Sequence, residues 1–179
     1  MDAIERRAAA FHRAGHAVIG RVLRLPCAGA VIAAGQPGGE VIVPDPWLAL
    51  SMWWDVDEKY RPVEAAYRAT IIGLMAGREA EVAFLGAILC DQSQDNHHIL
   101  RMAEYLCDDG DWTHRRARLS RHAKRLVVRH RPGIERVAGA LLEHGRLQAE
   151  EIDAIVLRSA RGRGHESSHG RSAGSAALE

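Results

Sequence analysis

Two histidines near the amino terminus, His12 and His16, have the spacing of a pair of metal ligands. On a helix, residues four apart share a face with their Cβ atoms about 5–6 Å apart, so both imidazoles can reach one Zn²⁺ ion. In the usual form of this pattern, H-E-x-x-H, a glutamate follows the first histidine and acts as general base. Arg13 occupies that position here. Because a guanidinium stays protonated and cannot accept a proton, the pattern predicts a metal site without its base.

The charge of Arg13 also bears on metal binding. A unit positive charge about 5 Å from a dication costs roughly 6–7 kcal/mol at an effective dielectric constant near 20. We therefore expect Arg13 to point away from the metal, to pair with a carboxylate such as Glu79 or Glu81, or to bind an anion. The alternative is that the two histidines bind no metal and are packing or surface residues on one helix face.

Four blocks of the chain, in the same order, resemble the peptidase domain of FtsH-type ATP-dependent zinc metalloproteases. The block Ala8–Val18 resembles that family's A-x-H-E-A-G-H-A-V segment. Further along, Gly73–Glu81 resembles G-G-R-x-A-E-E, and Ser93–Asp95 resembles S-N-D. The last block, Leu141–Ile152, is similar to the closing L-L-x-x…L-x-x-E-E-I pattern.

The resemblance implies roles for individual residues. Asp95 would be the third zinc ligand beside the two histidines, and Glu81 would accept a hydrogen bond from a ligating histidine and orient it. Val82 stands where the family has a second glutamate, and Arg13 stands where it has the catalytic one. The resemblance therefore implies a zinc peptidase domain in which peptide-bond hydrolysis is weakened or lost.

Local sequence gives a separate reason to consider Asp95. Ser93 is the predicted N-cap of a helix, which places Asp95 in the first turn, where the helix dipole favours an ionised carboxylate. Such a carboxylate can complete a three-ligand metal site, although a plain first-turn acid is the simpler interpretation. His97 and His98 are alternative ligands, and at most one could join because consecutive helix residues point in different directions.

Hydrophobic periodicity predicts the elements that would position these residues. It predicts helices at 2–25, 63–85, 113–130, 133–144 and 148–158, and a further helix that begins at Ser93 and includes Ala103. Two runs rich in β-forming residues, 30–34 and 40–43, flank a Gly- and Pro-containing segment and predict a β-hairpin. We expect a mainly α-helical α+β domain at 1–160, of FtsH type by resemblance. A disordered tail is expected at 161–179, which lacks periodic apolar residues.

Composition is that of an ordinary globular domain, with 47% hydrophobic and 26% charged residues among 179. A net charge of +1 gives no overall attraction to nucleic acid. The three cysteines lack C-x-x-C spacing, so we expect no disulfide framework and a reducing, cytoplasmic location. The amino terminus does not resemble a secretory signal, and no apolar run approaches the roughly 18 residues of a membrane span.

The predicted helix at 113–130 is strongly basic, with seven Lys and Arg residues and no acid. We interpret it as a solvated face balanced by acids on the last helices. Functional alternatives are binding to an acidic protein, to nucleic acid or to an anionic membrane surface.

No G-x-x-x-x-G-K-[ST] loop occurs, so the chain resembles the peptidase part of the family standing alone. We expect an unfolded peptide or protein as substrate or partner and a separate ATPase as a candidate partner; the sequence leaves the oligomeric state open. Three hypotheses account for Arg13. The domain holds zinc but serves as a binding or regulatory module, it hydrolyses peptides with Glu79 or Glu81 as base, or the arginine is an engineered replacement of a natural glutamate.

Overall fold

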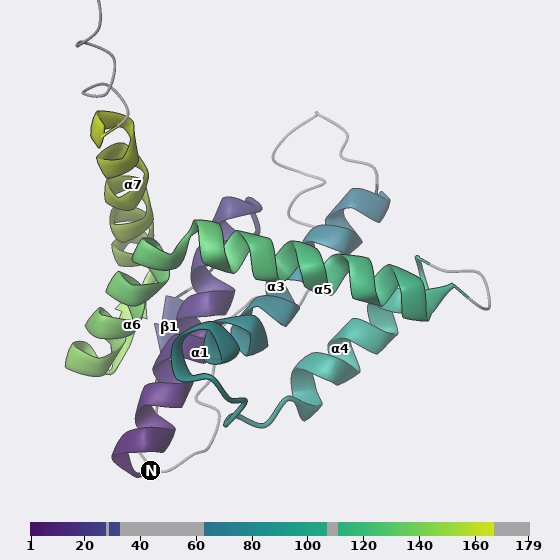
Figure 1. The fold of residues 1–179 in the computed structure, drawn as a ribbon, viewed down its shortest axis with the longest axis horizontal. Coiled ribbons are helices and arrows are strands. Elements are labelled where there is room, and N and C mark those ends of the chain that lie inside the picture. Colours follow the sequence, from purple (N-terminus) through teal and green to yellow (C-terminus); the bar gives the residue numbers. More distant parts are fainter. Residues whose placement is uncertain (28, 33–62, 107–110, 167–179) are drawn as a thin grey trace, which may run out of the picture.

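The computed structural model describes residues 1–27, 29–32, 63–106 and 111–166 (Figure 1). The elements in chain order are α1 (Ala3–Val22), β1 (Gly29–Val31), α3 (Val63–Leu85), α4 (Ser93–Ala103), α5 (Trp112–Arg129), α6 (Arg131–His144), β2 (Arg146–Gln148) and α7 (Ala149–Glu166). The described part is therefore mainly helical with a small two-stranded antiparallel sheet, as predicted. None of its helices combines the length and apolar character needed to cross a membrane.

Helix α1 begins at a capping box formed by its first residues. The Asp2 carboxylate accepts hydrogen bonds from the N–H groups of Ile4 and Glu5, both at 2.8 Å. Glu5 in turn accepts a hydrogen bond from the Asp2 N–H at 2.9 Å. These bonds satisfy N–H groups that the first helical turn leaves without partners, so the start of α1 is fixed locally.

The middle of α1 is buried and packs against both α3 and α6. Small residues make the approach to α3 very close at Gly15, where an added Cβ would lie 2.5 Å from the carbonyl oxygen of Ala76 and 2.8 Å from the Cβ of Ala80. The core continues from this contact into α5, α6 and α7. Its largest fully buried apolar side chains include Ile19, Ile71, Ile134, Leu141 and Ile152. The close contact between α1 and α3 fixes the position of the histidine-bearing turns of α1.

The small sheet differs from the predicted hairpin. Strand β1 pairs antiparallel with β2, with Ala30 opposite Leu147, whereas the predicted partner at 40–43 lies outside the described residues. Gly145 ends α6 in a left-handed conformation, with φ of 74°, and its carbonyl accepts a hydrogen bond from Ile32 at 2.8 Å. The sequence-based prediction missed β2 because its three residues directly follow a helix C-cap and have no strand-length pattern of their own.

Two helix ends also differ from prediction. The N-cap of α4 is Gln92 rather than Ser93, because the Ser93 N–H and hydroxyl both donate to the carboxylate of Asp91, at 2.9 and 2.7 Å. Helix α7 runs to Glu166 instead of ending near Arg158. Extending an existing helix requires no apolar periodicity, so the pattern underestimated its length. Residues 167–179, the rest of the predicted tail, lie outside the described residues, and the 1–160 domain boundary stays a prediction.

Helix α5 is amphipathic as predicted. Leu119, Ala123 and Val127 are buried, while most of its cationic side chains are exposed. Arg115 forms an ion pair of 3.3 Å with Glu64, which lies in the first turn of α3 rather than on the last helices. The charge of α5 is thus balanced in part from a different element than the sequence suggested.

Candidate metal centre

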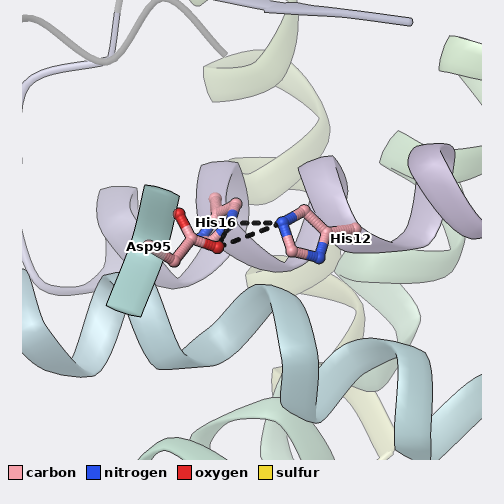
Figure 2. Close-up of side chains that lie close together, drawn as sticks. All are labelled: His12, His16 and Asp95. Atoms are coloured by element: carbon pink, nitrogen blue, oxygen red, sulfur yellow. Dashed lines mark hydrogen bonds and ion pairs between the residues drawn. The ribbon is translucent and has the colours of Figure 1, made fainter. Parts of the chain in front are cut away.

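The side chains of His12, His16 and Asp95 converge from two helices (Figure 2). The two histidines project from consecutive turns of α1, and Asp95 projects toward them from the first turn of α4. The two Nε2 atoms are 2.9 Å apart, and Asp95 Oδ2 lies 3.2 Å from Nε2 of His16 and 3.3 Å from Nε2 of His12. Ligand atoms in a tetrahedral zinc site with bonds of 2.0–2.1 Å are about 3.3–3.4 Å apart. The separations therefore fit one small cation with modest adjustment.

Hydrogen bonds on the far side of each ring determine which nitrogen faces the cluster. Nδ1 of His16 donates to the carbonyl oxygen of Gly73 at 2.8 Å, and Nδ1 of His12 donates to Oε1 of Glu81 at 2.7 Å. In a neutral imidazole, Nε2 then carries a lone pair directed at the cluster. Asp95 Oδ2 is buried and receives no hydrogen bond from the described residues. Three lone pairs thus meet in a buried space, an arrangement that a cation stabilises.

The pKa values of His12 and Asp95 are both shifted by their proximity to each other and to neighbouring groups. Burial lowers the pKa of His12, but contacts with Asp95 and Glu81 outweigh it and raise the pKa above its usual 6.5. Burial raises the pKa of Asp95, but the charge of His16 and contacts with both imidazoles hold it well below its usual range. A metal bound here would compete with a proton for Nε2 of His12, so its affinity should increase with pH.

Glu81 anchors the centre from α3 although it is fully buried, with 0% of its surface exposed. Besides the His12 proton, its carboxylate accepts hydrogen bonds from the backbone N–H groups of Leu89 and Cys90, at 2.5 and 2.8 Å, and from Nε2 of Gln92 at 3.1 Å. Burial raises the pKa of Glu81, but these bonds outweigh it and lower the pKa overall. A carboxylate with its lone pairs engaged and no exposed surface holds His12 in place and is poorly suited to take a proton from a substrate.

A second group of possible ligand atoms comprises His12, Glu81 and Cys90. Burial and the charge of Glu81 raise the pKa of the Cys90 thiol to about 12, although the nearby charge of Arg13 opposes this. Because cysteine binds metals as thiolate, this group is the poorer candidate. Arg13 itself is half-buried on α1.

The remaining predicted residues lie around the cluster rather than in it. Glu79 accepts a hydrogen bond from the Ser120 hydroxyl of α5 at 3.1 Å. His97 and His98 form an edge-to-face ring contact with each other, with centroids 5.8 Å apart, and neither belongs to a group of possible metal ligands in the described part of the chain.

Gly77 is a site residue that the sequence analysis missed. An added Cβ at this position of α3 would lie 2.5 Å from Nε2 of His16 and 2.9 Å from Cε1 of His12. Gly73, one turn earlier on α3, supplies the carbonyl that holds His16. The signal was a glycine pair four residues apart at the end of the apolar stretch 71–77 of α3. Glycine inside a helix costs about 1 kcal/mol relative to alanine and needs a packing reason.

We predict that Gly77→Ala destabilises the metal-free protein by about 1–3 kcal/mol, because the new methyl group overlaps two rings held by hydrogen bonds. It should also weaken zinc binding by displacing both imidazoles. Urea denaturation and zinc titration would measure the two effects. The matched control is Gly139→Ala in α6, where an added Cβ meets nothing within 4 Å. This control should gain roughly 0.5–1 kcal/mol and keep its zinc affinity, and equal behaviour of the two variants would contradict the prediction.

Comparison with known proteins places these observations in context. No protein-family model matches the chain. The chain is 27% identical over 182 residues to "ATP-dependent zinc metalloprotease FtsH 1" from Symbiobacterium thermophilum. This similarity indicates a distant FtsH-like relationship. The alignment covers 86% of the chain but 29% of the relative, so the chain spans less than a third of that protein's length.

Proposed function

We propose that this chain is a metallopeptidase-like domain of FtsH type that holds zinc through His12, His16 and Asp95, with hydrolysis weakened or lost. The observation that carries the proposal is the meeting of two imidazole Nε2 atoms and a buried carboxylate oxygen within 3.3 Å of one another. The similarity to a protein named as a zinc metalloprotease supports zinc as the metal. Imidazole and carboxylate are common ligands of Zn²⁺.

The residues of the chain have distinct parts in this function. A zinc ion bound here would act as a Lewis acid on a peptide carbonyl. Glu81 keeps the Nδ1 proton of His12 in place, and the Gly73 carbonyl does the same for His16, so both rings offer Nε2. Arg13 follows His12 directly but accepts no proton, whereas a general base contributes about 10²–10⁴-fold to such reactions.

Arg13 gives rise to two alternatives on the same scaffold. One is a non-catalytic module that binds or regulates peptides or proteins, favoured by a permanent charge that can donate hydrogen bonds to an anion or a carbonyl oxygen. The other is an active hydrolase with another carboxylate as base. Of the two candidates for that base, Glu81 is buried and hydrogen-bonded to four groups, while Glu79 is partly exposed and lines the same pocket as Asp95.

The test combines metal content with cleavage of a denatured protein, before and after Arg13→Glu. We expect about one zinc per chain, negligible cleavage by the native chain, and a gain on the order of 100-fold or more in the variant. The control is Arg118→Glu, which makes the same charge change on an exposed face of α5 and should leave cleavage unchanged.

Other outcomes separate the alternatives. A chain that binds no zinc under metal-replete conditions would overturn the metal centre. Cleavage by the native chain that is abolished by Glu79→Gln would favour the active hydrolase with Glu79 as its general base. Zinc binding with no cleavage even after Arg13→Glu would favour the binding module. On all these readings the proposed ligand is an unfolded peptide or protein, with a separate ATPase as a proposed partner and the cytoplasm as the proposed location.

A further inference from the structure

A pocket of about 330 Å³ lies beside the metal centre, between α3, α4 and α5. Asp95 belongs to both sites, because its Oδ2 faces the histidines while the residue also lines the pocket. The volume is at the lower end of the roughly 300–1,000 Å³ typical of ligand pockets, which suits a group about the size of one amino acid. Anything held here would lie next to the metal ligands.

The pocket combines an apolar lining with charges. Its apolar residues are Leu74, Met75, Ile99, Trp112 and Ala117. Arg78 and Arg116 supply two positive charges, and Glu79 and Asp95 supply two negative ones. Because the Asp95 carboxylate faces the two histidines, the other three charges sum to +1. A pocket of this composition favours an apolar group that carries a negative charge.

Arg78 and Arg116 are available to bind a ligand, whereas Glu79 already has a hydrogen-bond partner. Glu79 accepts a hydrogen bond from the Ser120 hydroxyl at 3.1 Å. Arg116 makes one long contact, 3.4 Å from Nη2 to Oδ1 of the neutral Asn96. Arg78 is exposed and forms no ion pair within the described part of the chain.

We propose that this pocket binds a carboxylate carried on an apolar body, supplied by the last residue or by an acidic side chain of a peptide. The apolar body packs on the lining, and Arg78 and Arg116 bind the carboxylate, for which planar guanidinium groups are well shaped. The inference deepens the proposed function, because it names the chemistry of the peptide that the metal centre receives. It also narrows the substrate class from any unfolded chain to chains that present a carboxylate near an apolar group.

The test measures binding of four fluorescently labelled tetrapeptides by polarisation. They end in leucine with a free carboxylate, in leucine amide, in an amide with an internal glutamate, or in an amide with glutamine in its place. We expect the free carboxylate or the glutamate peptide to bind at least about 10-fold more tightly than its neutral partner, since hydrogen bonds to charged groups contribute about 1.5–3 kcal/mol. Which pair shows the difference identifies the source of the carboxylate.

Variants assign the binding to this pocket. Arg78→Gln and Arg116→Gln should each remove most of the preference for the charged peptide, and Ala117→Trp should block binding by filling the pocket. Arg118→Gln, an exposed arginine of α5 outside the pocket, should change nothing. Equal binding of charged and neutral peptides, or variants that bind as the native chain does, would overturn the proposal.

Each titration is carried out on the 179-residue chain in its metal-free and its zinc-loaded form. Binding that depends on Arg78 and Arg116 in both forms supports the pocket even when zinc binding fails. Zinc binding without any carboxylate preference overturns the pocket and leaves the metal centre intact. The two proposals therefore fail in distinguishable ways.

Discussion

Zinc affinity is expected to fall by at least about 100-fold when Asp95 is replaced by asparagine, since loss of an outer hydrogen-bond partner alone costs 10–100-fold. The substitution keeps the size of the side chain but removes the charge that faces two imidazoles at 3.2 and 3.3 Å. The amide oxygen is neutral and a weaker ligand for Zn²⁺. Calorimetric titration of metal-free protein measures the loss directly.

The matched control for this substitution is Asp111→Asn. Asp111 is exposed and precedes α5, and its side chain makes no capping hydrogen bond. It carries the same charge as Asp95 but lies outside the groups of possible ligands in the described residues. The control should bind zinc as the native chain does. Native affinity in the Asp95→Asn protein would show that the carboxylate is not a ligand.

Glu81→Ala is expected to lower the free energy of unfolding by about 3–5 kcal/mol, the cost of removing one partner from a buried charged pair. The change leaves His12 and the backbone N–H groups of Leu89 and Cys90 without their acceptor, in a site where Glu81 is fully buried. Urea denaturation of the metal-free protein measures the effect. The control is Glu79→Gln, two residues earlier on α3. Its neutral amide oxygen weakens one hydrogen bond from Ser120, so the free energy of unfolding should fall by no more than about 1 kcal/mol.

The loss of stability on Glu81→Ala should depend on pH. The pKa of Glu81 is lowered in the folded chain from its ordinary 4.5, so its contribution to stability is complete above that value and is lost as the pH falls through the folded pKa. The difference in unfolding free energy between the native chain and Glu81→Ala should therefore shrink in acid. A difference that stays constant down to strongly acidic pH would mean that the carboxylate acts through packing alone.

The helices were predictable because their determinants are local. The range predicted for α3 coincides with Val63–Leu85, and the predicted end of α6 at residue 144 coincides with its last residue, which Gly145 follows as a left-handed C-cap. Spacing placed His12 and His16 on one face of a helix, and the structure brings Asp95 to them. Local pattern and family resemblance together were thus enough to nominate the cluster, whereas its metal is still a proposal.

The rest could not be read from the sequence because it depends on contacts between distant segments. Glu81 accepts hydrogen bonds from the backbone N–H groups of Leu89 and Cys90. Every residue except proline has such a group, so the residue types at these positions do not indicate the contact. The pairing of β1 with β2 joins segments far apart in the chain, and strands of three residues are too short for a sequence pattern to indicate which segments pair. The spacing of Gly73 and Gly77 marked a close approach to α3, but only the structure shows that the two imidazole rings occupy the space at Gly77.

The contact between His16 and the main-chain carbonyl of Gly73 has a consequence for how such a domain can change over time. A backbone oxygen is present whatever residue is encoded, so no loss of a polar side chain at that position can release the ring. The orientation of His16 is therefore independent of the residue at position 13, where Arg13 stands in place of the family's base. On the proposed function, exchange of the base at position 13 would remove hydrolysis and leave the hydrogen bond that orients His16 unchanged.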